Sequence, residues 1–276
     1  MIRGFAVTDL HLHVHPASMQ RAAAHALMEG TEHHVLADSP AALLRALDVW
    51  GIERAGIVNY VAPDVMGYPP EINDWCARYC GAAPDRLIPF GSVHPRFSKS
   101  AREETERVLD LGARILKIHP PHQHLRVNDY DSGLGDMYAV AQERGVPVMV
   151  HTGTSVFPGA RNVFADPMPC DDVAVDFPDL KLILAHVGRP LHVETAVFLA
   201  RRHANVWLEI SGIPPRRLME WIPRLADLAP KTLWGTDWPG PGVRDPKANV
   251  EAFLDLPLDE GVKRAILDGN SRRLLP

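Results

Sequence analysis

Three features that would each mark a different class of protein are missing from this sequence of 276 residues. Disulfides are the first, because three cysteines, Cys76, Cys80 and Cys170, cannot form a paired framework, which indicates a reducing, cytoplasmic environment. Membrane segments are the second: no apolar run approaches the roughly 18 residues that a membrane helix needs, and Asp9 interrupts the N-terminus before a signal-peptide core could form. Blocks of like charge are the third, and with a net charge of −5 we expect neither a nucleic-acid nor a membrane partner.

What the sequence does contain is a regular alternation of short apolar runs and helical segments. The expected strands are Ile2–Asp9, Arg54–Tyr60, Leu87–Val93, Arg114–His119, Pro147–Thr152, Lys181–His186, Val206–Ser211 and Lys231–Thr236. The expected helices are Pro40–Trp50, Glu71–Gly81, Ser100–Leu111, Gly135–Arg144, Cys170–Phe177, Val193–His203, Arg216–Leu228 and Glu260–Asp268. Most of the strands are continuous apolar runs, as in parallel sheets that are buried on both faces.

Eight strand–helix units in a chain of this length predict an α/β fold, a single-domain (β/α)8 TIM barrel over residues 1–276. An open doubly wound sheet is the alternative, but it usually carries a glycine-rich phosphate loop after the first strand. This sequence has DLHLHVHP at that position.

Proline is abundant, with 25 residues, almost twice the average share of about 5%. Several prolines fall at or just after expected strand ends: Pro16, Pro95, Pro120, Pro190 and Pro239. The residue before a proline favours extended backbone, and proline cannot continue a central strand. We therefore expect polar side chains at the carboxyl ends of the strands, which is where barrel enzymes have their active sites.

Four histidines and one aspartate stand at these strand ends. His11 and His13 are two residues apart and share a face, so they could form half of a site for zinc or a similar ion, or be half-exposed loop histidines. His151 and His186 each end an apolar strand and, taken alone, could be core groups with satisfied hydrogen bonds. Asp237 could cap a helix, but Pro-Gly-Pro follows it, and a carboxylate after a buried strand is unfavourable unless it is paired or bound to a metal. A barrel would bring all five to one mouth.

The order of motifs along the chain extends this pattern. The motifs are Asp9-x-His11-x-His13, Gly91-Ser-Val-His-Pro95, Leu116-Lys-Ile-His-Pro120, Val150-His-Thr-Gly153, Ala185-His186, Gly235-Thr-Asp-Trp238 and the closing Ile266-Leu-Asp-Gly-Asn270 with Arg273-Leu-Leu. Over nearly its whole length the chain resembles the amidohydrolase superfamily, in the amidohydrolase-related branch that includes aminocarboxymuconate-semialdehyde decarboxylase.

The resemblance implies one divalent metal ion, Zn²⁺ with Mn²⁺ or Fe²⁺ as alternatives, held by His11, His13, His151 and Asp237. His186 becomes a general acid/base or an orienting group, and Asp237 the catalytic acceptor of a proton from water. A bound divalent ion lowers the pKa of its water from near 16 to about 7. It also polarises a carbonyl or carboxylate oxygen.

Four further residues are candidates for binding the substrate. In binuclear relatives a carboxylated lysine on the fourth strand bridges two metals, and Lys117, on the fourth expected strand, could take that role. With one ion expected, it becomes a substrate-binding cation or part of an internal ion pair. His119 shares its face and is a pocket donor or a strand-end residue. Arg161 and Arg189 could bind an anion through their guanidinium forks or form loop salt bridges. The long loop Thr152–Asp166 could cover the mouth.

Some residues are set aside at this point. We expect His122 and His124 to be solvated loop residues, although they could create a second site, and Trp221 to be a packing residue. Cys76 and Cys80, four apart, are expected to be buried free thiols on one helix face.

The predicted function is metal-dependent hydrolysis of a small anionic lactone, ester or amide. Decarboxylation of an aromatic or muconate-type acid is the alternative, and the chain is short for such decarboxylases. A binding barrel without catalysis is a third hypothesis, but all five matching positions carry residue types that can bind a metal. The expected partner is a small-molecule substrate, and the family resemblance suggests a homodimer.

Overall fold

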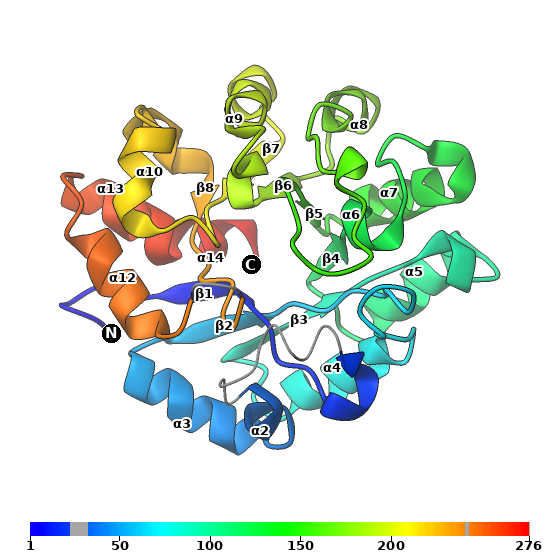
Figure 1. The fold of residues 1–276 in the computed structure, drawn as a ribbon, viewed down its shortest axis with the longest axis horizontal. Helices are drawn as coiled ribbons and strands as arrows, with labels where there is room; N and C mark the ends of the chain where they lie inside the picture. The colour runs from blue at the N-terminus through cyan, green and yellow to red at the C-terminus, as the bar shows by residue number, and fades with distance from the viewer. Residues whose placement is uncertain (23–32, 241–242, 276) are drawn as a thin grey trace.

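The computed structural model describes residues 1–22, 33–240 and 243–275. Its strands are parallel and follow one another in chain order around the sheet (Figure 1). They are β1 (Thr8–Leu12), β2 (Arg54–Ile57), β3 (Leu87–Gly91), β4 (Ile115–Ile118), β5 (Val148–His151), β6 (Leu182–Ala185), β7 (Val206–Glu209) and β8 (Thr232–Leu233). All of their residues except Arg54 and Pro89 are buried, as expected for strands covered on both faces.

Backbone hydrogen bonds between the first and last strand segments close the sheet. Leu10 N donates to Trp234 O at 3.0 Å, and Asp237 N donates to His11 O at 2.8 Å. His13 N continues this line with a 2.7 Å bond to Trp238 O. The predicted (β/α)8 barrel is thus confirmed, and its closure brings the ends of β1 and β8 side by side.

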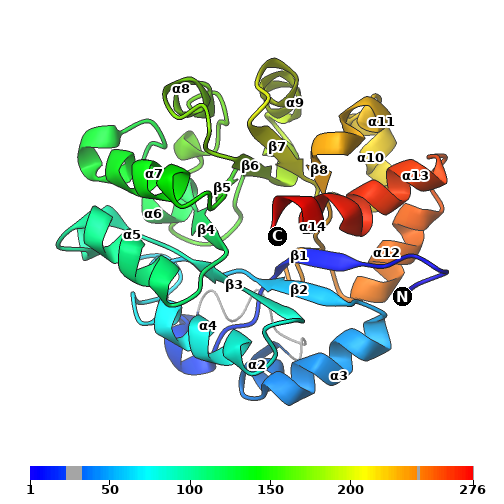
Figure 2. The same ribbon diagram turned by 180° about the vertical axis from the view of Figure 1, so that it is seen from behind.

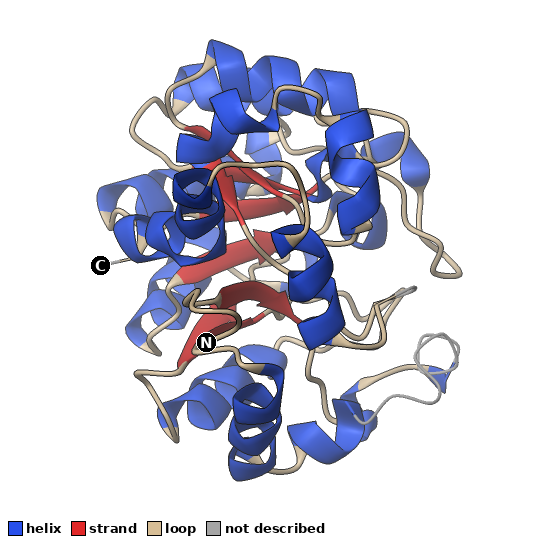
Figure 3. Ribbon diagram, turned by 90° about the vertical axis from the view of Figure 1, so that its left-hand side faces the viewer, coloured by secondary structure: helices blue, strands red, loops and turns tan. Residues whose placement is uncertain are grey.

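Helices surround the sheet, so that the strands lie in the interior (Figures 2 and 3). They are α2 (His33–Ala37), α3 (Pro40–Trp50), α4 (Ile72–Gly81), α5 (Ala101–Asp110), α6 (Pro120–Gln123), α7 (Leu134–Glu143), α8 (Cys170–Asp176), α9 (Val193–Arg202), α10 (Pro215–Trp221), α11 (Leu225–Leu228), α12 (Pro246–Leu254), α13 (Glu260–Arg264) and α14 (Asn270–Leu274). The start of α3 shows how the sequence sets a boundary, because the Ser39 side chain accepts a hydrogen bond from Ala42 N and Pro40 occupies the first turn.

Two expected elements were wrong in their boundaries. The first strand does not begin at Ile2, because Ile2 and Phe5 pair across a turn that has Gly4 at a φ of +82°. The expected helix Arg216–Leu228 is two helices, α10 and α11, separated at Pro223, whose ring disfavours helical backbone in the preceding residue. Helix α12 was not expected, although Asp245 caps it and Pro246 begins it.

The buried apolar residues form three clusters, of which two contain most of the strand residues. Leu10, Phe90, Ile115, Met149 and Ile183 belong to a cluster contributed mainly by the strands. A larger cluster joins alternate strand residues to the surrounding helices. Among the described residues, no helix has the length and apolar character that crossing a membrane requires.

Candidate active site

A cavity of about 340 Å³ lies where the strands end at their carboxyl side. Six histidines line it: His11, His13, His119, His122, His151 and His186. Lys117, Arg189 and Asp237 line it too, so the structure brings together every predicted site residue except Arg161. Arg161 is exposed and is not among the lining residues.

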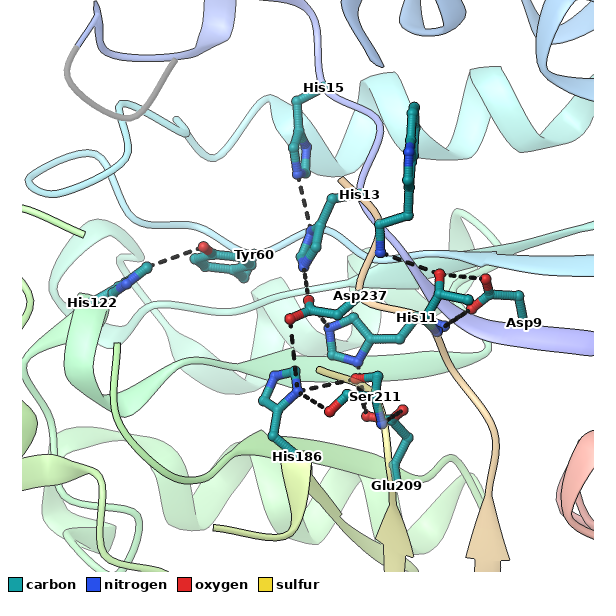
Figure 4. Close-up of polar contacts among 12 residues, drawn as sticks. Asp9, His11, His13, His15, Tyr60, His122, His186, Glu209, Ser211 and Asp237 are labelled. Carbon is teal, nitrogen blue, oxygen red and sulfur yellow. Dashed lines mark hydrogen bonds and ion pairs between the residues drawn. The ribbon is translucent and has the colours of Figure 1, made fainter. Parts of the chain in front are cut away.

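The closure of the barrel places Asp237 against the two histidines of β1. Asp237 Oδ1 lies 3.2 Å from His13 Nε2 and 3.6 Å from His11 Nε2 (Figure 4). One ligand atom from each of the three residues lies within 4.8 Å of the others. The backbone of Asp237 has a φ of +67°, which is unfavourable for a residue with a side chain and is typical of functional sites.

This donor set fits a divalent metal ion. His11 Nε2 and His151 Nε2 are buried and have no hydrogen-bond partner among the described residues. A buried polar atom without a partner is unfavourable, and a metal would satisfy it. Imidazole nitrogens with one carboxylate are typical ligands of zinc and of similar ions.

The sequence analysis missed Glu209, at the end of β7. Its Oε2 accepts hydrogen bonds from His11 Nδ1 at 2.9 Å and from the Ser211 hydroxyl at 2.8 Å, and its Oε1 accepts one from Ser211 N at 2.8 Å. The bond from His11 Nδ1 leaves His11 Nε2 as the atom that faces Asp237. The signal was present, because Glu209 follows a buried strand as Asp237 does. A second group of ligand atoms within 4.8 Å joins Glu209 to His11 and His186, so Glu209 could also hold a metal directly.

Ser211 connects Glu209 to His186. Its hydroxyl lies 3.0 Å from His186 Nδ1, and its carbonyl oxygen lies 3.1 Å from the same nitrogen. His186 Nδ1 is also 3.9 Å from Asp237 Oδ2. Figure 4 shows the chain of contacts that runs from His11 through Glu209 and Ser211 to His186.

Asp9 ties the end of β1 to the end of β8. Its carboxylate accepts hydrogen bonds from Thr236 N at 2.9 Å, from Thr236 Oγ1 at 2.6 Å and from His11 N at 3.1 Å. Burial raises the pKa of Asp9 to about 7, and these hydrogen bonds oppose the shift. Asp9 therefore fixes the backbone at His11 and at Thr236, the residue before Asp237.

Burial keeps the imidazoles of the cavity neutral, because it lowers the pKa values of His11, His119, His151 and His186 well below the usual range. For Asp237, burial alone would raise the pKa. The hydrogen bond from His13, the contact with His11 and the positive charge of Arg189 outweigh burial and hold that pKa below its ordinary value. An ionised carboxylate thus stands among neutral imidazoles, the protonation states that metal binding requires.

The two cations of the cavity differ in their contacts. Arg189 Nη2 donates to Asp237 Oδ2 at 3.1 Å. Lys117 is 1% exposed, and its Nζ has no hydrogen-bond partner among the described residues. Burial lowers its pKa, while the charges of Glu209 and Asp237 raise it. His119 stacks between two other histidines, with ring centroids 3.7 Å from His151 and 3.5 Å from His122.

Two residues that were set aside belong to the cavity. His122 was expected to be solvated, but it is buried, with Tyr60 Oη 3.0 Å from its Nδ1 and Ser155 Oγ 2.7 Å from its Nε2. It lies three residues after His119, so the short helix α6 returns it to the same wall. Trp221, expected to be a packing residue, also lines the cavity, as does part of the loop Thr152–Asp166.

Known proteins share the family profile and the fold of this chain. The sequence profile of the amidohydrolase family matches residues 8–276. A search of curated proteins finds no match. An uncharacterised TIM-barrel protein of Bordetella bronchiseptica has a similar structure, with 25% identity, a TM-score of 0.78 and 98% of both chains covered.

Two decarboxylases also share the fold. A dihydroxybenzoic acid decarboxylase of a Polaromonas species, solved with bound manganese and an inhibitor, has 17% identity and a TM-score of 0.72, covering 98% of this chain and 97% of the other. The 5-carboxyvanillate decarboxylase of Sphingomonas paucimobilis has 17% identity and a TM-score of 0.68 over 99% of both chains.

Proposed function

The chain belongs to the amidohydrolase family, and from that premise we propose that it is a metal-dependent hydrolase of a small anionic lactone, ester or amide. The observation that carries the proposal is the ionised Asp237 carboxylate beside the imidazoles of His11 and His13 in one cavity. This combination can bind a metal and also accept a proton from water.

His11, His13, His151 and Asp237 would hold the ion, with zinc or manganese as the first candidates. A bound divalent ion lowers the pKa of water and polarises a carbonyl oxygen, which makes hydrolysis feasible at neutral pH. Bound manganese in the Polaromonas decarboxylase supports a divalent metal in this fold.

Side chains of this protein would accept and transfer the protons. Asp237 accepts the proton of the attacking water, because it stays ionised and lies at the centre of the histidine group. His186 donates from Nδ1 to the Ser211 carbonyl oxygen, so its Nε2 carries no proton. Nε2 would take up the proton that Asp237 has accepted from water and pass it to the leaving group. Arg189 holds Asp237 Oδ2 in place.

Non-oxidative decarboxylation is the second candidate, and the likeness to the two aromatic acid decarboxylases favours it. The same groups could serve it, with His186 protonating the carbon that loses carbon dioxide.

One experiment separates the two reactions. The chain loaded with zinc or with manganese is incubated with aryl lactones and esters and, in parallel, with hydroxylated benzoic acids. We expect metal-dependent acid release from the lactones and esters. Carbon dioxide release from the benzoic acids alone would establish decarboxylation and contradict the hydrolase proposal. If neither reaction occurs in a metal-loaded chain, the cavity is a binding site without catalysis.

A further inference from the structure

Lys117 presents an unusual combination of position and contacts. It belongs to β4, whose side chains face either the barrel interior or the helices, and it lines the same cavity as Asp237. Its side chain is among the largest fully buried ones of the described chain, yet its ammonium group has no hydrogen-bond partner there. A buried ammonium group is unfavourable unless an anion or several acceptors satisfy it.

Among the described residues, no carboxylate contacts Lys117 Nζ directly. The Glu209 carboxylate is engaged by His11 and by Ser211, and Asp237 is engaged by Arg189 and His13. Burial lowers the pKa of Lys117 to about 8, while both carboxylates favour its charged form through space. Of the two cations that line the cavity, Arg189 is paired with Asp237 through Nη2, although its Nε has no partner among the described residues, whereas Lys117 has no paired group at all there.

His119, in the neighbouring wall of the cavity, offers a second hydrogen-bonding group for an anion at Lys117. His119 lies two residues after Lys117 on the same face, and its buried Nδ1 has no hydrogen-bond partner among the described residues. Its ring is fixed between His151 and His122 by stacking. A neutral imidazole held in one orientation can add one N–H donor to those of the ammonium group.

We propose that Lys117, assisted by His119, binds a carboxylate of the substrate, as a subsite separate from the group formed by His11, His13 and Asp237. The subsite takes a single negative charge, because the second charge of a phosphate would be repelled by the nearby Glu209 and Asp237 carboxylates. The carboxylate subsite depends on the proposed function in one respect only, because it places the reacting carbonyl group of the substrate at Asp237.

Binding of benzoate, with benzamide as a neutral probe of the same shape, tests the subsite without any turnover. Isothermal titration calorimetry is performed on the metal-loaded full chain, on Lys117→Met and on the matched surface variant Lys99→Met, since Lys99 is exposed. We expect Lys117→Met to weaken benzoate binding about 10- to 100-fold, the usual loss for a hydrogen bond to a charged group, and to leave benzamide binding unchanged. Lys99→Met should bind both probes as the wild type does.

Benzoate binding that is equally strong in Lys117→Met would overturn the subsite. The wild type alone provides a second test that does not depend on how the variant folds: equal or weaker binding of benzoate than of benzamide also overturns it. Loss of the proposed function is a separate result, because a chain that hydrolyses nothing but binds benzoate through Lys117 keeps the subsite and refutes only the reaction.

Discussion

Replacing Glu209 by glutamine keeps the shape of the side chain and disturbs the hydrogen bonds that orient His11. The carboxylate is fully buried and accepts bonds from His11 Nδ1 at 2.9 Å and from two Ser211 donors at 2.8 Å. An amide has one acceptor oxygen and one NH₂ donor, so one of these N–H or O–H groups must face another donor. His11 Nδ1 could avoid facing the amide NH₂ group only if the imidazole proton moved to Nε2, which is the atom that faces Asp237.

The expected loss of metal affinity follows from this contact between two donors. A proton on Nε2 would block metal binding by His11, and a buried donor without a partner costs about 1–3 kcal/mol. We therefore expect Glu209→Gln to weaken Zn²⁺ and Mn²⁺ binding about 10- to 100-fold, in line with other residues that orient metal ligands. Competition with a chelator measures the affinity, and urea unfolding followed by circular dichroism checks the fold.

The exposed Glu194 provides the matched control, because Glu194→Gln makes the same chemical change on the surface. Wild-type metal affinity in Glu209→Gln would refute the reasoning about His11. A loss as large as that of Asp237→Asn would also contradict it, since Glu209 would then be a ligand itself, within the group that it forms with His11 and His186.

Three further predictions concern other parts of the site and fold. His186→Ala should lower turnover about 10²- to 10⁴-fold with little change in metal affinity; an equal loss of metal would make His186 a ligand. Gly235→Ala should weaken metal binding, measured by chelator competition, because the added Cβ would lie 2.6 Å from His11 Cβ and would contact Glu209 Oε1. Gly81→Ala is the control and should bind the metal as the wild type does, because its added Cβ would have no atom within 4 Å. Burial, with the charge of a neighbouring arginine, lowers the pKa of His94 from 6.5 to about 4, so the unfolded chain takes up a proton that the folded protein excludes. The stability that is present above pH 6.5 is therefore lost as the pH falls toward 4, by about 1.4 kcal/mol of unfolding free energy per pH unit. His94→Gln should remove this contribution to the pH dependence of the unfolding free energy, measured by urea unfolding between pH 7 and pH 5. The same pH dependence in wild type and variant would contradict the prediction.

The barrel could be predicted because its strands are short apolar runs separated by amphipathic segments. His11, His151, His186 and Asp237 could be placed at one mouth because each stands at a strand end, and parallel strands in a barrel end on the same side. The barrel topology alone was sufficient to place these four residues at one mouth.

The parts that could not be predicted depend on contacts between distant segments. The hydrogen bond from His11 to Glu209 joins residues 198 positions apart, and the burial of His122 depends on Tyr60 from another segment of the chain. Local pattern also misled at Ile2, where apolar residues imitate a strand although Gly4 turns the chain. Side-chain partners, unlike strand order, are not encoded in local periodicity.

The number of divalent ions bound by each chain, measured for the wild type and for Asp237→Asn, tests most directly whether His11, His13 and Asp237 form a metal site. We expect one Zn²⁺ or Mn²⁺ per wild-type chain and at least a 100-fold weaker affinity in the variant, on the order of the loss of a directly bound ligand. A wild type that binds no divalent ion, or a variant that binds it as tightly as the wild type, would contradict the account.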